Sequence, residues 1–365
     1  MRLAGLRLSI IIGDIQSMNK SAIALAVMTT ASAAAIAQSS VTLYGKIDVG
    51  LVVDGGNPAG KSVRLASGET AGSRIGFKGV EDLGGGYKAA FQIETGFCSD
   101  SAAGAPNFCT GSNQFMGRQD HGDLSGPFGS ISAGRQYSLD YTNIVTVDPF
   151  GTGLAGDVQD VIGDKTTIRL NNDILYTTPS FAGMTVSAEM ALGETTGNFK
   201  AGREFGGAIV YTHGPLFVDL TLFDVDNTNG AGVARKAWQL GAIYDFGVVK
   251  VHALGISAKG SPTGAQRPLD AVDMLLGVTV PVAGGSLLAN YARHDDRTAL
   301  TAPGGGDRDA SQWAIGYIYP LSKRTSAYTA YGRIDNEHGA TYTVGNATEN
   351  GTGNKAFNLG MVHNF

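Results

Sequence analysis

The feature that most constrains this chain is an alternation of apolar and polar residues that recurs along its length. Between Val41 and Leu51 the odd positions are mostly apolar, whereas Thr42, Lys46 and Asp48 occupy even positions. A period of two places successive side chains on opposite faces of a β-strand. Such a segment therefore predicts a strand with one apolar and one polar face.

The alternation returns in later segments, up to the last residues of the chain. These segments are 87–97, 184–190, 216–223, 312–319 and 357–365. Short turns rich in glycine and proline alternate with long polar loops, and the long loops are 98–113, 138–166, 193–203, 225–235, 257–269, 295–310 and 336–353. That rhythm is typical of outer-membrane barrels. Counting the segments predicts an all-β fold, a 16-stranded antiparallel transmembrane β-barrel with short periplasmic turns and long extracellular loops.

Composition excludes several other classes of protein. Charged residues make up 16% of the chain, against about 25% in typical globular domains. The net charge of −5 argues against a nucleic-acid partner, because such proteins usually present a basic face. A soluble β-sandwich also alternates but lacks the rhythm of long and short connections. A wide barrel encloses an aqueous lumen, which explains the polar residues on the inner faces.

Residues 1–37 are predicted to form a secretory signal peptide. Lys20 is followed by a short apolar run at 21–28, and Ala35-Ile36-Ala37 supplies a small-residue cleavage site. A transmembrane anchor fits this short apolar run less well, because a helix that spans a bilayer needs about 20 strongly apolar residues. Cleavage after Ala37 leaves residues 38–365 as the barrel domain.

The start of the chain contains a second candidate initiator. A compact signal peptide would begin at Met18, which Asn19 and Lys20 follow. We therefore interpret residues 1–17 as an over-extended start. No later stretch of about 18 residues is apolar enough to predict a spanning helix.

Several segments, in order along the mature chain, carry a likeness to a known family. They are 40–45, 73–86, 134–136, 244–247, 321–325 and 361–365. On these segments the chain resembles a general bacterial (Gram-negative) porin of the beta-proteobacterial type. The resemblance implies a homotrimer, an inward-folded third loop, and contact with outer-membrane lipids and lipopolysaccharide. It also implies that Phe365 is the terminal aromatic residue that the barrel-assembly machinery reads.

Two segments depart from the family pattern. Residues 118–124 form the expected fourth strand but are far more polar than in relatives. In the third loop, relatives often carry an element like Pro-Glu-Phe. Here the acid comes first, in Asp148-Pro149-Phe150.

The function implied by the resemblance is passive diffusion of small hydrophilic solutes and ions through a water-filled channel. We expect no covalent chemistry, no cofactor and no metal, because the six histidines are scattered and no ligand spacing accompanies them. Alternatives are a substrate-specific outer-membrane channel, a plugged barrel with an adhesin role, and a barrel-embedded hydrolase. In a channel of this kind the radius and the electric field of the constriction decide which solutes pass.

The third loop and the barrel wall supply the candidate constriction residues. The loop is rich in aspartate and has no basic residue before Lys165, whereas alternation places Arg74 and Arg169 on the inner face of the wall. The resemblance adds Arg118 and, more weakly, Arg135. The candidates are Arg74, Arg118, Arg135, Arg169, Asp148, Asp157 and Asp160.

These residues suggest a transverse field, with loop aspartates facing wall arginines. One pair about 8 Å apart contributes roughly 2 kcal/mol at an effective dielectric constant near 20. Each aspartate can also be an ordinary solvated loop residue. The acidic loop favours cations and the wall arginines favour anions, so the sequence leaves ion selectivity open.

Cys98 and Cys109 enclose a ten-residue segment of a long loop. In an oxidising compartment they could form a disulfide bond, which would restrict that loop by roughly 2–3 kcal/mol.

Overall fold

The computed structural model describes residues 40–101, 116–162, 167–226, 233–262, 268–299 and 307–365. The predicted signal peptide (1–37) lies outside these described residues, as does Met18. In the part that is described, no helix combines the length and the apolar character needed to cross a membrane.

Most of the described chain is β-structure, and its strands follow the predicted segments. In order they are β1 (Ser40–Asn57), β2 (Gly60–Ser67), β3 (Arg74–Gly84), β4 (Tyr87–Gly96), β5 (Gln119–Gly126), β6 (Gly129–Tyr137), α2 (Leu139–Val147), η1 (Leu154–Gly156), η2 (Val158–Asp160), β7 (Arg169–Thr177), β8 (Met184–Ala191), β9 (Arg203–His213), β10 (Leu216–Asp226), β11 (Val233–Asp245), β12 (Lys250–Pro262), β13 (Leu269–Val282), β14 (Gly285–Asp296), β15 (Ala310–Pro320), β16 (Thr325–Asn336) and β17 (Lys355–Asn364).

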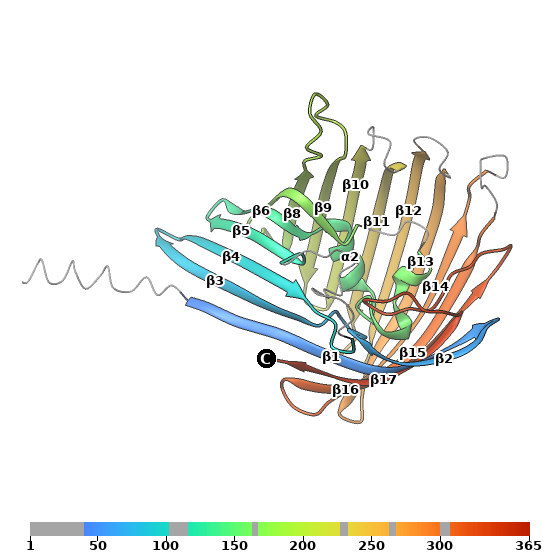
Figure 1. Ribbon diagram of the computed structural model, residues 1–365. Coiled ribbons are helices and arrows are strands. Elements are labelled where there is room, and N and C mark those ends of the chain that lie inside the picture. Colours follow the sequence, from blue (N-terminus) through green and yellow to red (C-terminus); the bar gives the residue numbers. More distant parts are fainter. Residues whose placement is uncertain (1–39, 102–115, 163–166, 227–232, 263–267, 300–306) are drawn as a thin grey trace, which may run out of the picture.

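The seventeen segments form one antiparallel sheet, and they make sixteen barrel strands because β2 and β3 are two parts of one strand. Both pair with β1: Val49 lies opposite Ser67, and Lys46 lies opposite Arg74. Residues 68–73 therefore leave the ladder, and we call them the strand break. The sheet closes where β1 pairs with β17 (Figure 1). The predicted 16-stranded antiparallel barrel is confirmed.

Side chains of each strand alternate between the lumen and the outside. On β13, Met274 and Leu276 are 56% and 63% exposed on the outer face, whereas Asp273 is buried on the inner face. Closure pairs the backbone groups of neighbouring strands, which is required where no water can satisfy them. Large exposed apolar side chains then fit a hydrocarbon surrounding rather than water.

The polar fourth barrel strand keeps its register. This strand is β5, and it pairs with β4 through Gln92 and His121 and with β6 through Asp120 and Arg135. Its alternation places Asp120 on the outer face with Leu124, and both side chains are exposed. Polar residues at this position therefore leave the strand intact but give the barrel a charged outer patch.

The long loop after β6 spans residues 138–168, and we call it loop 3. Its described residues, 138–162 and 167–168, fold into the barrel. Figure 1 shows α2 inside the ring of strands. The helix begins at Ser138, whose side chain accepts a hydrogen bond from the Tyr141 N–H at 3.3 Å. Buried Ile144, Leu154 and Val158 pack against apolar side chains of the inner wall. This packing holds the loop against one side of the lumen.

Loop 3 lies along a row of glycines on the inner wall. A Cβ added at Gly241 would meet the Val147 side chain at 2.5 Å, and one at Gly277 would meet Pro149 at 2.7 Å. At Gly332 it would collide with the carbonyl oxygen of Ala155. The wall thus lacks side chains where the loop backbone approaches it, so these glycines fix how far the loop reaches into the pore.

We predict that Gly332→Ala displaces loop 3 into the lumen, because the added methyl group meets backbone atoms that cannot move alone. Over-packing of this kind typically costs 1–3 kcal/mol, so the melting temperature should fall and single-channel conductance should change. Gly255→Ala is the matched control, since its Cβ would meet nothing within 4 Å. Equal conductance and equal melting temperature in the two variants would contradict the prediction.

Candidate functional site

A cavity of about 390 Å³ lies in the lumen between loop 3 and the barrel wall. Three arginines line it, and each stands next to a strand end: Arg74 begins β3, Arg118 directly precedes β5, and Arg169 begins β7. The other lining residues come from the strand break, from β6, from loop 3 and from the loop between β16 and β17, which we call loop 8 (residues 337–354). They are Ala71, Gly72, Tyr137, Tyr141, Val145, Gly151, Thr152, Ile168, Ala347 and Thr348.

One buried carboxylate holds two of the arginines in place. The Arg118 Nε donates to Glu94 Oε1 at 2.7 Å, and an Arg74 Nη lies 3.6 Å from the same oxygen. The hydroxyl of Tyr44 donates to the other oxygen of Glu94 at 3.0 Å. Glu94 is 2% exposed and sits behind the guanidinium groups. It therefore orients the cations without facing the cavity.

Tyr137 brings the second and third arginines together. Both Arg118 and Arg169 donate to its hydroxyl oxygen at 3.1 Å. The Arg169 guanidinium also lies 4.6 Å from the centroid of the Tyr137 ring, a cation–π contact. An aromatic ring and its hydroxyl thus support two like charges side by side, which would otherwise repel each other.

The charge of this cavity is strongly positive. Glu94 pairs with two of the three arginines from behind the cavity, and Lys46 lies opposite Arg74 in the β1–β3 ladder. No carboxylate belongs to the described residues that line the cavity. A low-dielectric wall makes such uncompensated charge act strongly on a passing ion.

Arg135 does not join the cluster. It stands on β6 at an irregularity in the β6–β7 register, with Asp120 as its partner on β5. Its Nε donates to the Gly117 carbonyl at 2.6 Å, and an Nη donates to Asn171 at 2.6 Å. By alternation it shares the outer face of β6 with Ile131 and Ala133, both of which are exposed.

Asp148, one of the predicted constriction acids, points into loop 3 instead of into the pore. Its oxygens accept N–H groups of Phe150, Thr152 and Val158 at 3.0–3.3 Å, together with the Asn290 side chain. Burial raises the pKa of Asp148 to about 6. The carboxyl group therefore organises the turn that reverses the loop.

Asp157 and Asp160 are also buried in loop contacts. Asp157 accepts the Gln159 N–H at 2.9 Å and so caps the 3₁₀ turn η2. Asp160 accepts the Gly345 N–H of loop 8 at 2.7 Å. Neither residue lines the cavity. The structure thus groups Arg74, Arg118 and Arg169 but does not place the three predicted aspartates opposite them across the cavity.

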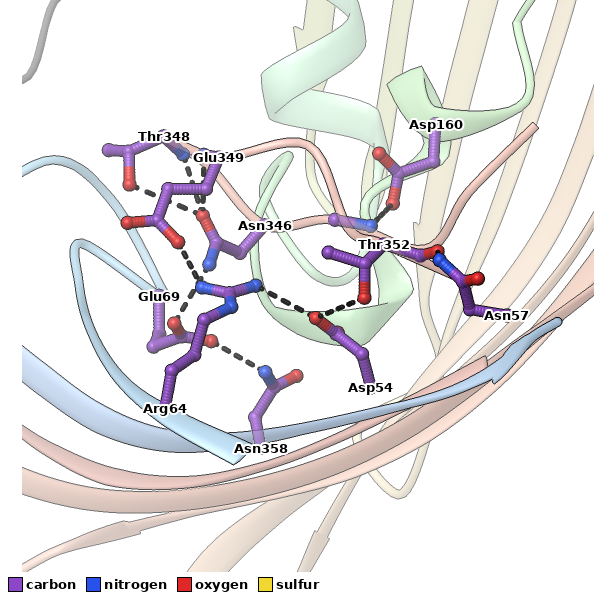
Figure 2. Close-up of polar contacts among 11 residues, drawn as sticks. Asp54, Asn57, Arg64, Glu69, Asp160, Asn346, Thr348, Glu349, Thr352 and Asn358 are labelled. Atoms are coloured by element: carbon purple, nitrogen blue, oxygen red, sulfur yellow. Dashed lines mark hydrogen bonds and ion pairs between the residues drawn. The ribbon is translucent and has the colours of Figure 1, made fainter. Parts of the chain in front are cut away.

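Loop 8 forms a further wall of the cavity, which the sequence alone did not indicate. Ala347 and Thr348 line the cavity, and the Thr348 hydroxyl donates to the Ser67 carbonyl at 2.5 Å, next to the strand break. Figure 2 shows the polar contacts that hold this loop. Arg64 pairs with Asp54 at 3.3 Å and also with Glu349 of loop 8.

Glu69 of the strand break contacts both loop 8 and β17 (Figure 2). Its carboxyl oxygens accept the side-chain amide of Asn346 in loop 8 at 2.8 Å and that of Asn358 in β17 at 2.6 Å. Its carbonyl accepts the Leu154 N–H of loop 3 at 2.5 Å. Burial, followed by the charge of Asp48, raises the pKa of Glu69 to about 8. One residue thus connects the wall, loop 3 and loop 8.

The predicted disulfide and the terminal aromatic residue lie at the ends of the barrel. Cys98 follows β4 and is disulfide-bonded, whereas Cys109 lies outside the described residues, so their pairing stays a prediction. Phe365 exchanges two backbone hydrogen bonds of 3.0 Å with Gly45 of β1. A side chain at Gly45 would collide with the Phe365 ring. The last residue is therefore part of the closing ladder, and its reading by the assembly machinery stays a prediction.

A closed barrel with an apolar exterior and a charged, loop-narrowed lumen defines a water-filled transmembrane channel. A sequence profile of the Gram-negative porins matches residues 24–340. Outer membrane porin protein 32 of Delftia acidovorans is 34% identical over 339 residues, which cover 89% of this chain and 92% of that protein. The major outer membrane protein P.IB of Neisseria lactamica is 28% identical over 93% of this chain and 100% of that protein.

Among solved structures, the anion-selective porin from Comamonas acidovorans matches with a TM-score of 0.76 at 29% identity, covering 90% of this chain and 100% of that one. The chain belongs to the Gram-negative porin family, of the beta-proteobacterial type. It is an outer-membrane, multi-pass β-barrel that lets small hydrophilic solutes and ions diffuse passively. Its family and fold are those of channel proteins rather than enzymes.

We predict that the contacts of Glu69 weaken as the pH rises. The folded pKa of Glu69, about 8, lies above its usual value of 4.5, so its contribution to stability is complete below pH 4.5 and is lost as the pH rises through 8. The wild-type protein should therefore melt several degrees lower at pH 9 than at pH 6.

Glu69→Gln should reduce this dependence, because a neutral amide has no proton to lose. The Asn358 Oδ1 has no hydrogen-bond partner among the described residues, so a flip of that amide lets the glutamine donate to it. The measurement is thermal unfolding in mild detergent between pH 5 and 9. Parallel melting curves for both proteins across this range would show that Glu69 does not titrate there.

Proposed function

We propose that this porin prefers anions and that Arg74, Arg118 and Arg169 set the preference. The observation that supports it is the lining of the cavity, where three guanidinium groups gather and none of the described lining residues carries a carboxylate. A chloride ion or a carboxylate solute in this cavity gains attraction from several donors at once. A cation meets uncompensated positive charge at the same place.

The comparisons with known porins support a preference for anions. The Comamonas acidovorans structure is described as an anion-selective porin, and at 29% identity its fold covers 90% of this chain. The net charge of this chain, −5, would favour cations if it acted at the pore. However, the three loop acids that were expected there are turned into backbone contacts, so the local charge and the net charge have opposite signs.

The test is the reversal potential of the mature protein in a planar bilayer under a potassium chloride gradient. We expect chloride to be favoured, and we expect Arg74→Gln and Arg169→Gln each to lower the chloride-to-potassium permeability ratio roughly two- to fivefold, the effect of about 0.5–1 kcal/mol. Arg333→Gln is the matched control, because Arg333 is half-exposed on the outer face and pairs with Asp335. A cation-preferring wild-type channel would overturn the proposal.

We further propose that the chain assembles as a homotrimer through the outer face of β3–β6. Asp120 and Arg135 lie opposite each other on that face, where charged groups are unfavourable in hydrocarbon. The strands there are short: β5 has 8 residues and β6 has 9, against 14 in β13. A second copy of the chain would cover this face and supply polar partners that lipid cannot.

The double variant Asp120→Ala/Arg135→Ala tests this interface. We expect it to weaken the oligomer, so that unheated protein migrates as a monomer at a lower detergent concentration or temperature than the wild type. Asp245→Ala/Lys250→Ala removes an exposed ion pair of 3.2 Å at the β11–β12 turn and is the control. If both double variants keep the wild-type oligomer, this face is not the interface.

A further inference from the structure

The helix of loop 3 presents apolar side chains to the arginine cavity. Tyr141 and Val145 are one turn apart on α2, so they lie on the same face of the helix. Both line the cavity and are half-buried, whereas Ile144 and Val147 of the same helix are buried in the core against the wall. A helix that stands in an aqueous lumen thus carries apolar side chains on its pore side as well as on its wall side.

Apart from the arginines, much of the described lining of the cavity is apolar. Ile168 and Ala347 add carbon atoms to it. Its two threonine hydroxyls have protein partners: Thr152 lies 3.1 Å from the Tyr141 hydroxyl, and Thr348 donates to a backbone carbonyl at the end of β2. Phosphate, which accepts hydrogen bonds in every direction, would therefore find donors on one side and carbon atoms on much of the other.

The wall side of the cavity supplies hydrogen-bond donors. Arg118 and Arg169 each use one N–H group on the Tyr137 hydroxyl oxygen, and a guanidinium group has five N–H donors in all. The Tyr137 oxygen accepts both of these bonds, so its own O–H can still donate to a third group. Guanidinium groups match the planar geometry of a carboxylate. The donors therefore fit a carboxylate that enters from the lumen.

Aromatic rings are already packed together beside these donors. The Arg169 guanidinium lies over the Tyr137 ring, and the centroids of the Tyr137 and Tyr141 rings are 5.0 Å apart. Aromatic rings commonly pair at about 4.5–7 Å, so a third ring can pack against Tyr141 in the same way. The cavity of about 390 Å³ also falls within the range of about 300–1,000 Å³ that small-molecule sites occupy, far more than a chloride ion fills.

We propose that the arginine cavity binds small aromatic carboxylates, of which benzoate is the simplest, during their passage through the pore. The carboxylate accepts N–H groups of Arg118 and Arg169, and the ring lies against Tyr141 and Val145. This inference rests on the proposed anion preference and adds to it a preference for anions that carry an apolar ring. A solute held in the cavity obstructs chloride, so it should reduce the chloride current.

The experiment is single-channel recording of the mature protein in a planar bilayer in potassium chloride, with benzoate, acetate or benzamide added to one side. Acetate has the same charge as benzoate without the ring, and benzamide has the ring without the charge. Benzoate should halve the chloride current at a concentration about tenfold lower than either of them, because only benzoate uses both the arginines and the apolar face.

Val145→Thr tests the apolar face, since it exchanges a methyl group for a hydroxyl group in a side chain of nearly the same shape. We expect it to raise the half-blocking concentration of benzoate about fourfold relative to that of acetate. Thr146→Val is the matched control, because Thr146 is the next residue of α2 but is exposed and does not line the cavity. This control should be blocked by benzoate as the wild type is.

Equal block by acetate and benzoate would mean that the cavity selects charge alone, and equal block by benzamide would mean that only the apolar face acts. Either result overturns the proposal, as does an unchanged benzoate block in Val145→Thr. The reversal potential of the same channels without added solute separates the two proposals. A chloride-preferring channel with no preference for benzoate overturns this inference alone, whereas a cation-preferring channel overturns the anion preference and this inference with it.

Discussion

The rest of the structure depends on closure of the sheet through β1 and β17. In hydrocarbon every backbone N–H and C=O must be paired within the protein, and only closure removes the two free edges. The outer face must then be apolar, so alternation sends the polar half of every strand into the lumen. A charged lumen follows from the fold itself. What distinguishes this channel is which charged side chains line the cavity beside loop 3.

Loop 3 shows how that distribution arises. Its turns contain N–H groups that no strand or helix satisfies, and Asp148, Asp157 and Asp160 accept them or accept an N–H of loop 8. A carboxylate that accepts backbone N–H groups points away from the water of the pore. The described part of this acidic loop therefore contributes no carboxylate to the cavity lining, and the wall arginines dominate there.

Alternation was sufficient to predict the strands, the barrel, and the inward side of Arg74 and Arg169, because a period of two is a local property. Arg118 was predicted only from the family resemblance, because the segment around it is too polar for alternation to indicate an inner and an outer face. The direction of Asp148 depends on three N–H groups of the folded loop and on Asn290, which is 142 residues away, and no period-two pattern reports either. The strand break was invisible for the same reason, because a break is defined only by the shift in register against β1.

Glu69 joins parts of the chain that are synthesised far apart. Its partner Asn346 is 277 residues further along, and Asn358 is 289 residues further along. Both belong to the last hairpin, so these bonds cannot form until that hairpin has taken its place beside β1. The contacts of Glu69 with loop 8 and β17 therefore depend on closure of the barrel. A barrel whose last hairpin was misplaced would keep the arginine cluster, which Glu94 and Tyr137 hold, but would lack the contacts that hold loop 8 against the cavity.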